Sequence, residues 1–343
     1  MLSHKQHLIS WVKKVTDKAE QLDKTLVVFS HYPMVEFNDD ASAQILELLG
    51  PGAMQLHRVP GEDVAQIFAD AGIKLHFGGH MHINDTGIRK TAANHTLINV
   101  QIPSLAAYIP AYKLLTIREK DLMEVETIII DSVPRYKEMF DLYSQEYAYL
   151  ERTGSPHIWN KEILSSTSYH EFTSWHLKEL VRLRFLPREW PPEFMDAIAD
   201  LSGRELMILS HGHQQDAAVG TILKAGLTPK QFNEWTGFDL IYDFYRVRNA
   251  DRLALKDIGA DRMSQYQLLF ESLLIGEMDP LSKDGSLFKD LKELGSIFQK
   301  FLNGAPADHF SINLNSGAVK DLTLDLPSEQ RDRREIYQAV TSD

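Results

Sequence analysis

The sequence predicts an α/β fold followed by a mainly α-helical region. Two short runs, residues 25–29 and 73–77, are almost wholly apolar, which is typical of strands buried on both faces of a sheet. From residue 134 to residue 303, apolar side chains recur at helical spacing instead. We therefore expect an α/β domain over residues 1–132 and a mainly α-helical domain over residues 133–343.

The expected elements of the first domain alternate between helices and strands. Leu8, Trp11 and Val12 recur at helical spacing, with lysines on the other face, and predict the first helix. A charged turn at residues 119–121 separates two apolar runs, which predict a hairpin. In chain order we expect helix 4–22, strand 25–29, helices 43–49 and 62–71, and strands 73–77, 96–101, 112–117 and 122–130.

The second domain shows several periodic segments of helical type. Proline-containing stretches at residues 188–192 and 304–306 interrupt the pattern, because proline ends a helix or fixes a loop. The expected helices cover residues 175–186, 205–209, 229–247, 288–302 and about 329–339.

The composition excludes several kinds of partner and site. The 343 residues carry a formal net charge of −12 and no block of lysine or arginine, so nucleic acid is not expected as a partner. The lack of cysteine excludes disulfides, thiolate metal sites and cysteine nucleophiles. No stretch approaches the roughly 20 apolar residues of a membrane span. The localisation stays open, and export is expected only if a signal lies in sequence upstream of Met1.

Three histidines directly follow predicted strands. His31 comes after the strand at 25–29, and His80 and His82 come after two glycines that end the strand at 73–77. Since the ends of parallel strands meet at one edge of a sheet, these imidazoles can converge there. Neutral imidazoles suit Zn, Fe, Mn or Ni better than Ca or Mg. The pattern therefore predicts a metal site at this edge.

Simpler explanations exist for residues of this kind. The chain has fourteen histidines, so a His-x-His pair also arises by chance. Asn84 and Asp85 either hold an imidazole or face the substrate, or they only form a turn. A second pair, His211 and His213, lies in helical surroundings, where residues two apart point in different directions. For that pair we expect a helix cap or a loop.

Two motifs make the chain resemble a known family. Ser-His-Tyr-Pro-Met at residues 30–34 and Gly-His-Met-His at residues 79–82 are similar to motifs in the C-terminal half of calcineurin-like metallophosphoesterases. The resemblance implies a two-sheet α/β sandwich over roughly residues 1–130 and a site for two divalent ions. It further implies that His31 and His80 ligate one ion and His82 the other, that His80 is catalytic, and that the substrate is a small phosphoester.

The same resemblance leaves part of the site unaccounted for. The family's Asp-x-His, Gly-Asp and Gly-Asn-His motifs should precede His31, and none occurs among the residues before it. We therefore expect the chain to be a fragment of a longer metal-dependent hydrolase, missing an N-terminal segment and inactive or impaired alone.

An incomplete fold would leave apolar surface uncovered. The strands at 25–29 and 73–77 need cover on both faces, so the chain is expected to expose an apolar sheet face and to self-associate. The alternative is that the helical segment folds back and covers this face. The alternative function is a non-enzymatic helical interaction module attached to a severed phosphoesterase half.

Overall fold

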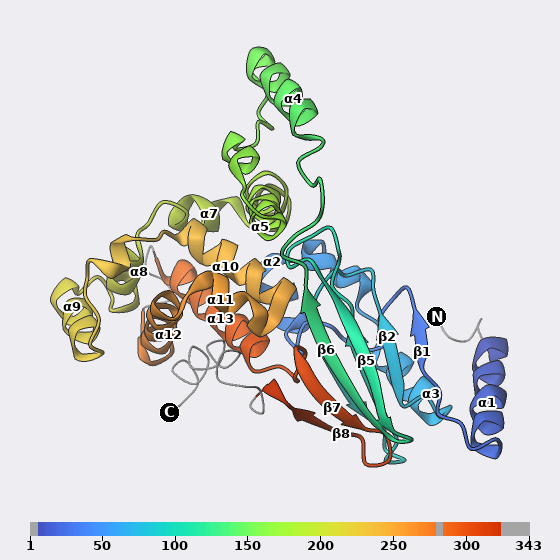
Figure 1. Ribbon diagram of the computed structural model, residues 1–343. Helices are drawn as coiled ribbons and strands as arrows, with labels where there is room; N and C mark the ends of the chain where they lie inside the picture. Colours follow the sequence, from blue (N-terminus) through green and yellow to red (C-terminus); the bar gives the residue numbers. More distant parts are fainter. Residues whose placement is uncertain (1–5, 279–283, 324–343) are drawn as a thin grey trace.

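The computed structural model describes residues 6–278 and 284–323 and contains two four-stranded sheets and a large group of helices (Figure 1). The strands are β1 (Val28–Ser30), β2 (Leu75–Gly78), β3 (Thr86–Lys90), β4 (Thr96–Gln101), β5 (Ala111–Glu119), β6 (Leu122–Ile129), β7 (His309–Asn313) and β8 (Ala318–Asp321). The first sheet has the order β1-β2-β4-β3, with β3 antiparallel to β4 and the other pairs parallel. The second sheet is antiparallel, with the order β5-β6-β7-β8.

Helices cover one face of the first sheet, and the second sheet packs on the other. Val12 of α1 (Gln6–Gln21) and Phe68 of α3 (Glu62–Asp70) share a core with Leu97 of β4. Leu75 of β2 shares a different core with Phe310 of β7. The predicted α/β character is therefore confirmed, as are the hairpin β5–β6 and the first helix.

The second sheet is completed by a late part of the chain, which the sequence analysis did not predict. Residues 309–321 were expected within the helical domain, but β7 pairs with β6. The five residues of β7 alternate between partly exposed and buried positions, which is the signature of a half-buried strand. Such a short alternation is easily missed beside long helical patterns.

The helical part lies between β6 and β7 in the sequence. Its elements are α4 (Phe140–Thr153), η3 (Lys161–Ser165), α5 (Tyr169–Leu180), η4 (Val181–Phe185), α6 (Leu186–Glu189), α7 (Pro192–Ile198), α8 (Gly203–Ser210), α9 (Gln215–Lys224), η5 (Gln231–Asn233), α10 (Gly237–Ala250), η6 (Asp251–Ala254), α11 (Leu255–Ile258), α12 (Ala260–Ile275) and α13 (Gly285–Leu302). The helix expected at 229–247 begins only at α10, because the Thr236 side chain caps its N-terminus. The helix expected at 329–339 lies outside the described residues.

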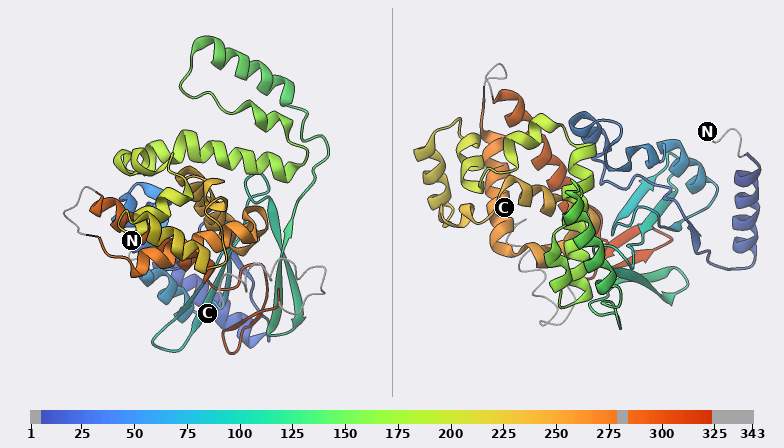
Figure 2. Two further views of the ribbon diagram at one scale, coloured as in Figure 1. Left: turned by 90° about the vertical axis from the view of Figure 1, so that its left-hand side faces the viewer. Right: turned by 90° about the horizontal axis from the view of Figure 1, so that it is seen from above.

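The helical part and the α/β part share one hydrophobic core. Ile45 of α2 (Ser42–Leu49) and Met54 of η2 (Ala53–Arg58) belong to the same cluster as Phe244 of α10. Figure 2 shows that α4 projects away from this body. No helix within the described ranges is both long enough and apolar enough to span a membrane.

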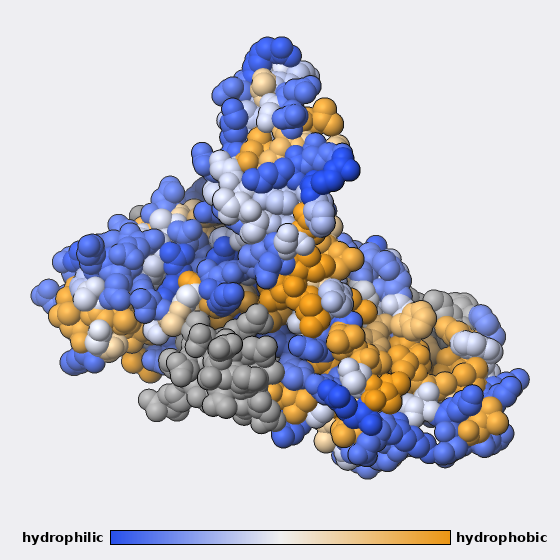
Figure 3. All heavy atoms as spheres, in the orientation of Figure 1, coloured by the Kyte–Doolittle hydropathy of each residue, from blue (hydrophilic) through white to orange (hydrophobic). Residues whose placement is uncertain are grey.

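Apolar side chains remain exposed on both sheets. Phe29 of β1 is 80% exposed, and Leu114 and Ile117 lie exposed on β5. Figure 3 shows apolar atoms gathered over β5 and β6. The expectation of an uncovered face is wrong for the strand at 73–77, because β2 is buried along its whole length. Self-association through the exposed surface stays a prediction.

Candidate metal-binding histidine site

His31 and His80 follow two neighbouring parallel strands. β1 pairs with β2 so that Ser30 lies opposite Gly78, and the residues after both strands therefore emerge at the same edge of the sheet. The Gly79 amide donates a hydrogen bond to the carbonyl oxygen of His31 at 3.1 Å. This bond ties the two loops together.

The imidazoles of His31 and His80 are in direct contact. Nε2 of His31 lies 2.9 Å from Nδ1 of His80, and the ring centroids are 4.8 Å apart in an edge-to-face arrangement. The two nitrogens form a hydrogen bond in which one ring N–H donates to the other nitrogen. In a tetrahedral site two imidazole nitrogens bound at about 2.1 Å lie about 3.4 Å apart, so an ion held by both histidines would replace this hydrogen bond and move the rings slightly apart.

Gly78 allows the two histidine loops to approach this closely. A Cβ atom at this position would lie 3.1 Å from the Cα atom of Pro33, closer than such contacts normally are. Pro33 belongs to the loop that carries His31. A side chain at position 78 would therefore push that loop away from His80.

We call the loop after β2, residues 79–83, the histidine loop. Its residues alternate between buried and more exposed positions. Met81 and Ile83 are buried against Phe37, whereas His80 is half-buried and His82 is exposed. His80 and His82 have φ angles of 66° and 57°, in the left-handed region that non-glycine residues rarely adopt. Backbone conformations of this kind concentrate at functional sites. The buried anchors thus hold both imidazoles toward the surface.

The surroundings of His80 favour its neutral form. Burial lowers its pKa most, and the nearby positive or ionisable groups of His31, Arg58, His82 and His57 lower the pKa further. A metal ion binds the neutral imidazole, because that form has a free lone pair. His80 is therefore in the state that a metal ligand requires.

Three residues beside the histidines were not predicted from the sequence. The ring centroid of Tyr32 lies 4.3 Å from that of His80, and the guanidinium carbon of Arg58 lies 5.4 Å from the ring centroid of Tyr32. His57 precedes Arg58 in η2. From the sequence, this segment is recognisable only as a loop between two Pro-Gly pairs. No pattern in it predicts that the chain comes back to the edge of β1.

The helical part fixes the start of η2. The Met54 amide donates to Oε2 of Glu189 at 3.0 Å, and Arg248 donates to the Met54 carbonyl oxygen at 3.0 Å. Just after η2, Val59 packs against the buried anchors of the histidine loop. Both ends of the segment that carries Arg58 are therefore held.

Asn84 joins the histidine loop to the helical part. Its side chain is almost fully buried, donates to Oδ1 of Asp308 at 2.8 Å and accepts a hydrogen bond from Lys113. Its backbone amide donates to the carbonyl oxygen of Asn249 in α10 at 2.8 Å. These partners place Asn84 behind the histidine loop, on the side of the helices.

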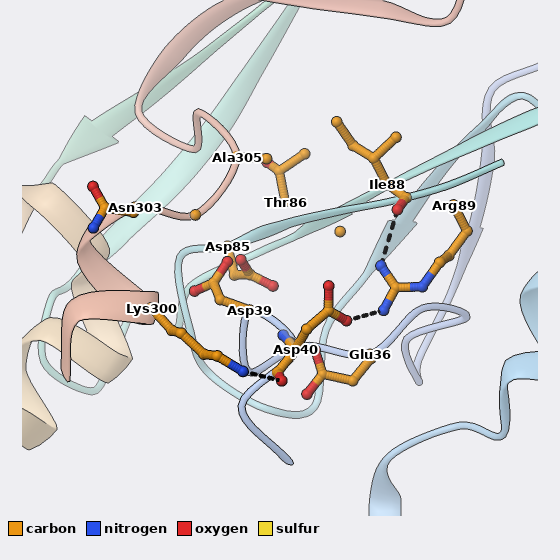
Figure 4. A pocket seen from close by; sticks show the side chains of 12 residues that line it. Glu36, Asp39, Asp40, Asp85, Thr86, Ile88, Arg89, Lys300, Asn303 and Ala305 are labelled. Carbon is orange, nitrogen blue, oxygen red and sulfur yellow. Dashed lines mark hydrogen bonds and ion pairs between the residues drawn. The ribbon is translucent and has the colours of Figure 1, made fainter. Parts of the chain in front are cut away.

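Asp85 lies in an acidic cavity of about 300 Å³ between the loop after β1, the start of β3 and the end of α13 (Figure 4). The carboxyl groups of Asp39 and Asp85 lie beside each other and share a hydrogen bond. Burial raises the pKa of Asp85 to about 7, and burial together with the nearby Asp85 charge raises that of Asp39 to about 10. A protonated Asp39 can therefore donate to Asp85, which avoids two adjacent buried charges.

The second His-x-His pair has structural partners. Nδ1 of His211 lies 2.9 Å from the Met207 carbonyl oxygen, and its Nε2 lies 2.9 Å from Oγ1 of Thr221. Nε2 of His213 lies 2.9 Å from Oδ2 of Asp284. His211 is the residue that ends α8, as expected of a helix cap.

Across the described residues, no group of three or more His, Cys, Asp or Glu side chains is placed to hold one metal ion. His31 and His80 provide two nitrogen ligands, so a complete site needs others. No protein-family model matches the chain, and no curated protein matches it either. A functional assignment therefore depends on the geometry of the histidines and on the motifs that contain them.

Proposed function

We propose that this chain is part of a metal-dependent hydrolase of phosphoric esters, of the calcineurin-like type. The observation that carries the proposal is the 2.9 Å approach of His31 Nε2 to His80 Nδ1 at the shared edge of β1 and β2. The resemblance of the surrounding motifs to that family supports it. So does the shared core of the two sheets, since the resemblance implies a two-sheet sandwich.

The histidines would bind two divalent ions. His31 and His80 would hold one ion and His82 the other, with Mn, Fe, Zn or Ni as the metals that suit imidazole ligands. When bound, the ions supply polarisation of the phosphoryl oxygens and activation of water. By the resemblance, His80 takes the catalytic role, and its ring contacts those of His31 and Tyr32.

The histidines supply only the nitrogen ligands of such a site. By the resemblance, carboxylate and asparagine ligands belong to motifs that are absent before His31, so a polypeptide segment outside this sequence would contribute them. The chain alone is then expected to bind a metal ion less tightly than the complete site. It should hydrolyse phosphoesters slowly or not at all.

Metal binding tests the proposal directly. Zn²⁺ is titrated into the purified chain and followed by calorimetry. We expect His80→Ala to weaken binding by about tenfold or more, because one of two adjacent ligands is lost. His95→Ala is the matched control, since His95 pairs with Asp70 in another part of the surface. Wild-type affinity in His80→Ala would show that the histidine pair is not the metal site.

Hydrolysis is a second readout of the same proposal. Any cleavage of a chromogenic phosphoester with added Mn²⁺ should disappear in both His80→Ala and His82→Ala. Cleavage that persists in both variants would have to come from another site.

One observation favours the alternative, a helical interaction module. The projecting α4 carries Leu142 and Tyr149, and Met139 lies just before its first residue. The three side chains recur at helical spacing, and each is about half exposed. Exposed apolar side chains aligned along one helix face are typical of a contact surface. A well-folded chain that binds no metal ion would favour this function.

A further inference from the structure

An arginine lies beside the histidines of an acidic chain. The whole chain has a formal net charge of −12. Nevertheless, the guanidinium carbon of Arg58 lies 5.4 Å from the ring centroid of Tyr32, and that ring lies 4.3 Å from the ring of His80. A permanent positive charge at this place attracts anionic ligands.

Arg58 carries this permanent charge, and most of its donors are available. Its Nη1 atom lies 3.5 Å from the Tyr32 hydroxyl oxygen, and its guanidinium carbon lies 5.4 Å from the Tyr32 ring centroid. Both side chains are exposed. In the part of the chain that the structure describes, Arg58 has no carboxylate partner. A guanidinium has five donors in a planar fork that matches the oxygens of a phosphate group.

The fold holds Arg58 at this place. η2 is fixed at Met54 by Glu189 and Arg248, and Val59 is packed beneath the histidine loop. The contact with Tyr32 further restricts the long arginine side chain. A side chain that is already ordered loses less entropy when it binds a ligand.

We infer that Arg58, steadied by Tyr32, binds a terminal phosphoryl group, and that the substrate of the site is a phosphomonoester. The inference rests on the proposed function for the reaction itself. A monoester has three non-bridging oxygens and close to two negative charges near neutral pH. A diester has two non-bridging oxygens and a single negative charge. The planar fork of Arg58 therefore gains more from a terminal phosphoryl group than from a diester.

Phosphate binding to the metal-free chain tests this inference. Inorganic phosphate is titrated into the full chain after removal of metal ions, and NMR of the histidine ring protons follows the binding. Arg58→Ala should weaken phosphate binding by about tenfold, and Arg58→Lys by less, because lysine keeps the charge but loses the planar fork. Dimethyl phosphate, a diester with a single negative charge, should bind more weakly than phosphate, because a guanidinium gains more from a doubly charged group.

Arg152→Ala is a closely matched control. Arg152 is also exposed and lies over a tyrosine ring, 5.7 Å from the centroid of Tyr149, but on the projecting α4. The Arg152→Ala variant should bind phosphate as tightly as the wild-type chain does. Equal affinity in wild type and Arg58→Ala, or no response of the histidine protons to phosphate, overturns the role of Arg58. Equal binding of phosphate and dimethyl phosphate overturns the monoester assignment.

The two proposals can fail separately. Phosphate binding is measured without any metal ion, whereas the proposed function is tested by Zn²⁺ titration of His80→Ala. If His80→Ala binds Zn²⁺ as the wild-type chain does, Arg58 can still be an anion-binding residue. If Arg58→Ala binds phosphate as the wild-type chain does, the metal site can still exist, but its contact with the phosphoryl group is then unassigned.

Discussion

Burial controls the protonation of carboxyl groups behind the histidine loop. It raises the pKa of Asp85 to about 7 and that of Asp308 to about 6, compared with 3.8 for an ordinary aspartate. The folded chain therefore holds protons that the unfolded chain releases above about pH 4. The stability that these groups contribute is complete below about pH 4 and is lost as the pH rises through about 6 to 7.

Replacement of Asp85 should make stability less dependent on pH. We predict that the free energy of unfolding falls between pH 5 and pH 8, and that Asp85→Asn reduces this fall by on the order of 2 kcal/mol, because the amide cannot ionise. Urea unfolding at both pH values measures the effect. Asp70→Asn is the control, since that exposed carboxyl has its pKa lowered by the hydrogen bond with His95. An unchanged pH dependence in Asp85→Asn would contradict the prediction.

Individual residues differed in how far the sequence could predict their role. His31, His80 and His82 could be selected because each directly follows an apolar run, and the ends of parallel strands meet at one edge. Arg58 could not, because its place beside Tyr32 depends on anchors in the helical part. The pairing of Asp39 with Asp85 likewise depends on packing that no local pattern records.

Two helices of the helical part begin side by side. The N-cap residues Ser202 of α8 and Thr236 of α10 form an isolated antiparallel bridge, and each side chain caps its own helix. The Gly203 amide donates to the Trp235 carbonyl oxygen at 3.0 Å. A Cβ atom on Gly203 would overlap the fully buried ring of Trp235. Glycine is required here by the close approach of the two helix starts.

A methyl group at this crossing should destabilise the helical part. We predict that Gly203→Ala lowers stability by on the order of 2 kcal/mol, because a buried indole ring must move. Gly220→Ala in α9 is the matched control, since nothing lies within 4 Å of its added Cβ atom. That substitution should raise stability by about 0.5–1 kcal/mol. Thermal unfolding should separate the two variants, and a similar midpoint for both would refute the steric argument.

The elements themselves were predicted unevenly. Long periodic segments such as α1 and α13 and the alternating hairpin β5–β6 could be recognised, because several residues repeat the same signal. β1 and β2 are equally short, but they lie in apolar runs, whereas β3, β7 and β8 contain no such run and were missed. Their assignment as strands depends on pairing with β4 and β6, which lie elsewhere in the sequence.

At the scale of the whole molecule, the helical part supports the histidine site from behind. Met54 contacts Glu189 and Arg248, which lie 135 and 194 residues further along the chain. Asn84 contacts Asp308, 224 residues further along. Contacts over such separations carry no local signal, so the sequence divides the chain into two parts without showing that they share one core.

The exposed edge of the first sheet should drive self-association. β1 is an edge strand, and the exposed ring of Phe29 adds apolar surface to this strand. We predict that the wild-type chain associates with rising concentration and that Phe29→Thr weakens this association by about tenfold or more, since burial of a phenylalanine contributes roughly 1.5–3 kcal/mol. Light scattering over a concentration series measures the effect.

A second exposed apolar residue provides the control for this prediction. Leu223→Thr removes an exposed side chain from α9, which lies at the opposite end of the molecule from β1 (Figure 1), and should leave association unchanged. A wild-type chain that stays monomeric at all concentrations would remove the basis for the prediction.

The position of β7 and β8 has a consequence for the order of events during synthesis. β6 is complete at Ile129, but its partner β7 starts at His309. At roughly 5–20 residues per second, a ribosome needs about 10–35 s to add the intervening residues. For that time β6 has one open edge in the nascent chain, and the apolar face of the first sheet lacks part of its cover. Chaperone binding to ribosome-bound chains should therefore rise after β6 emerges and fall only once β7 has left the exit tunnel.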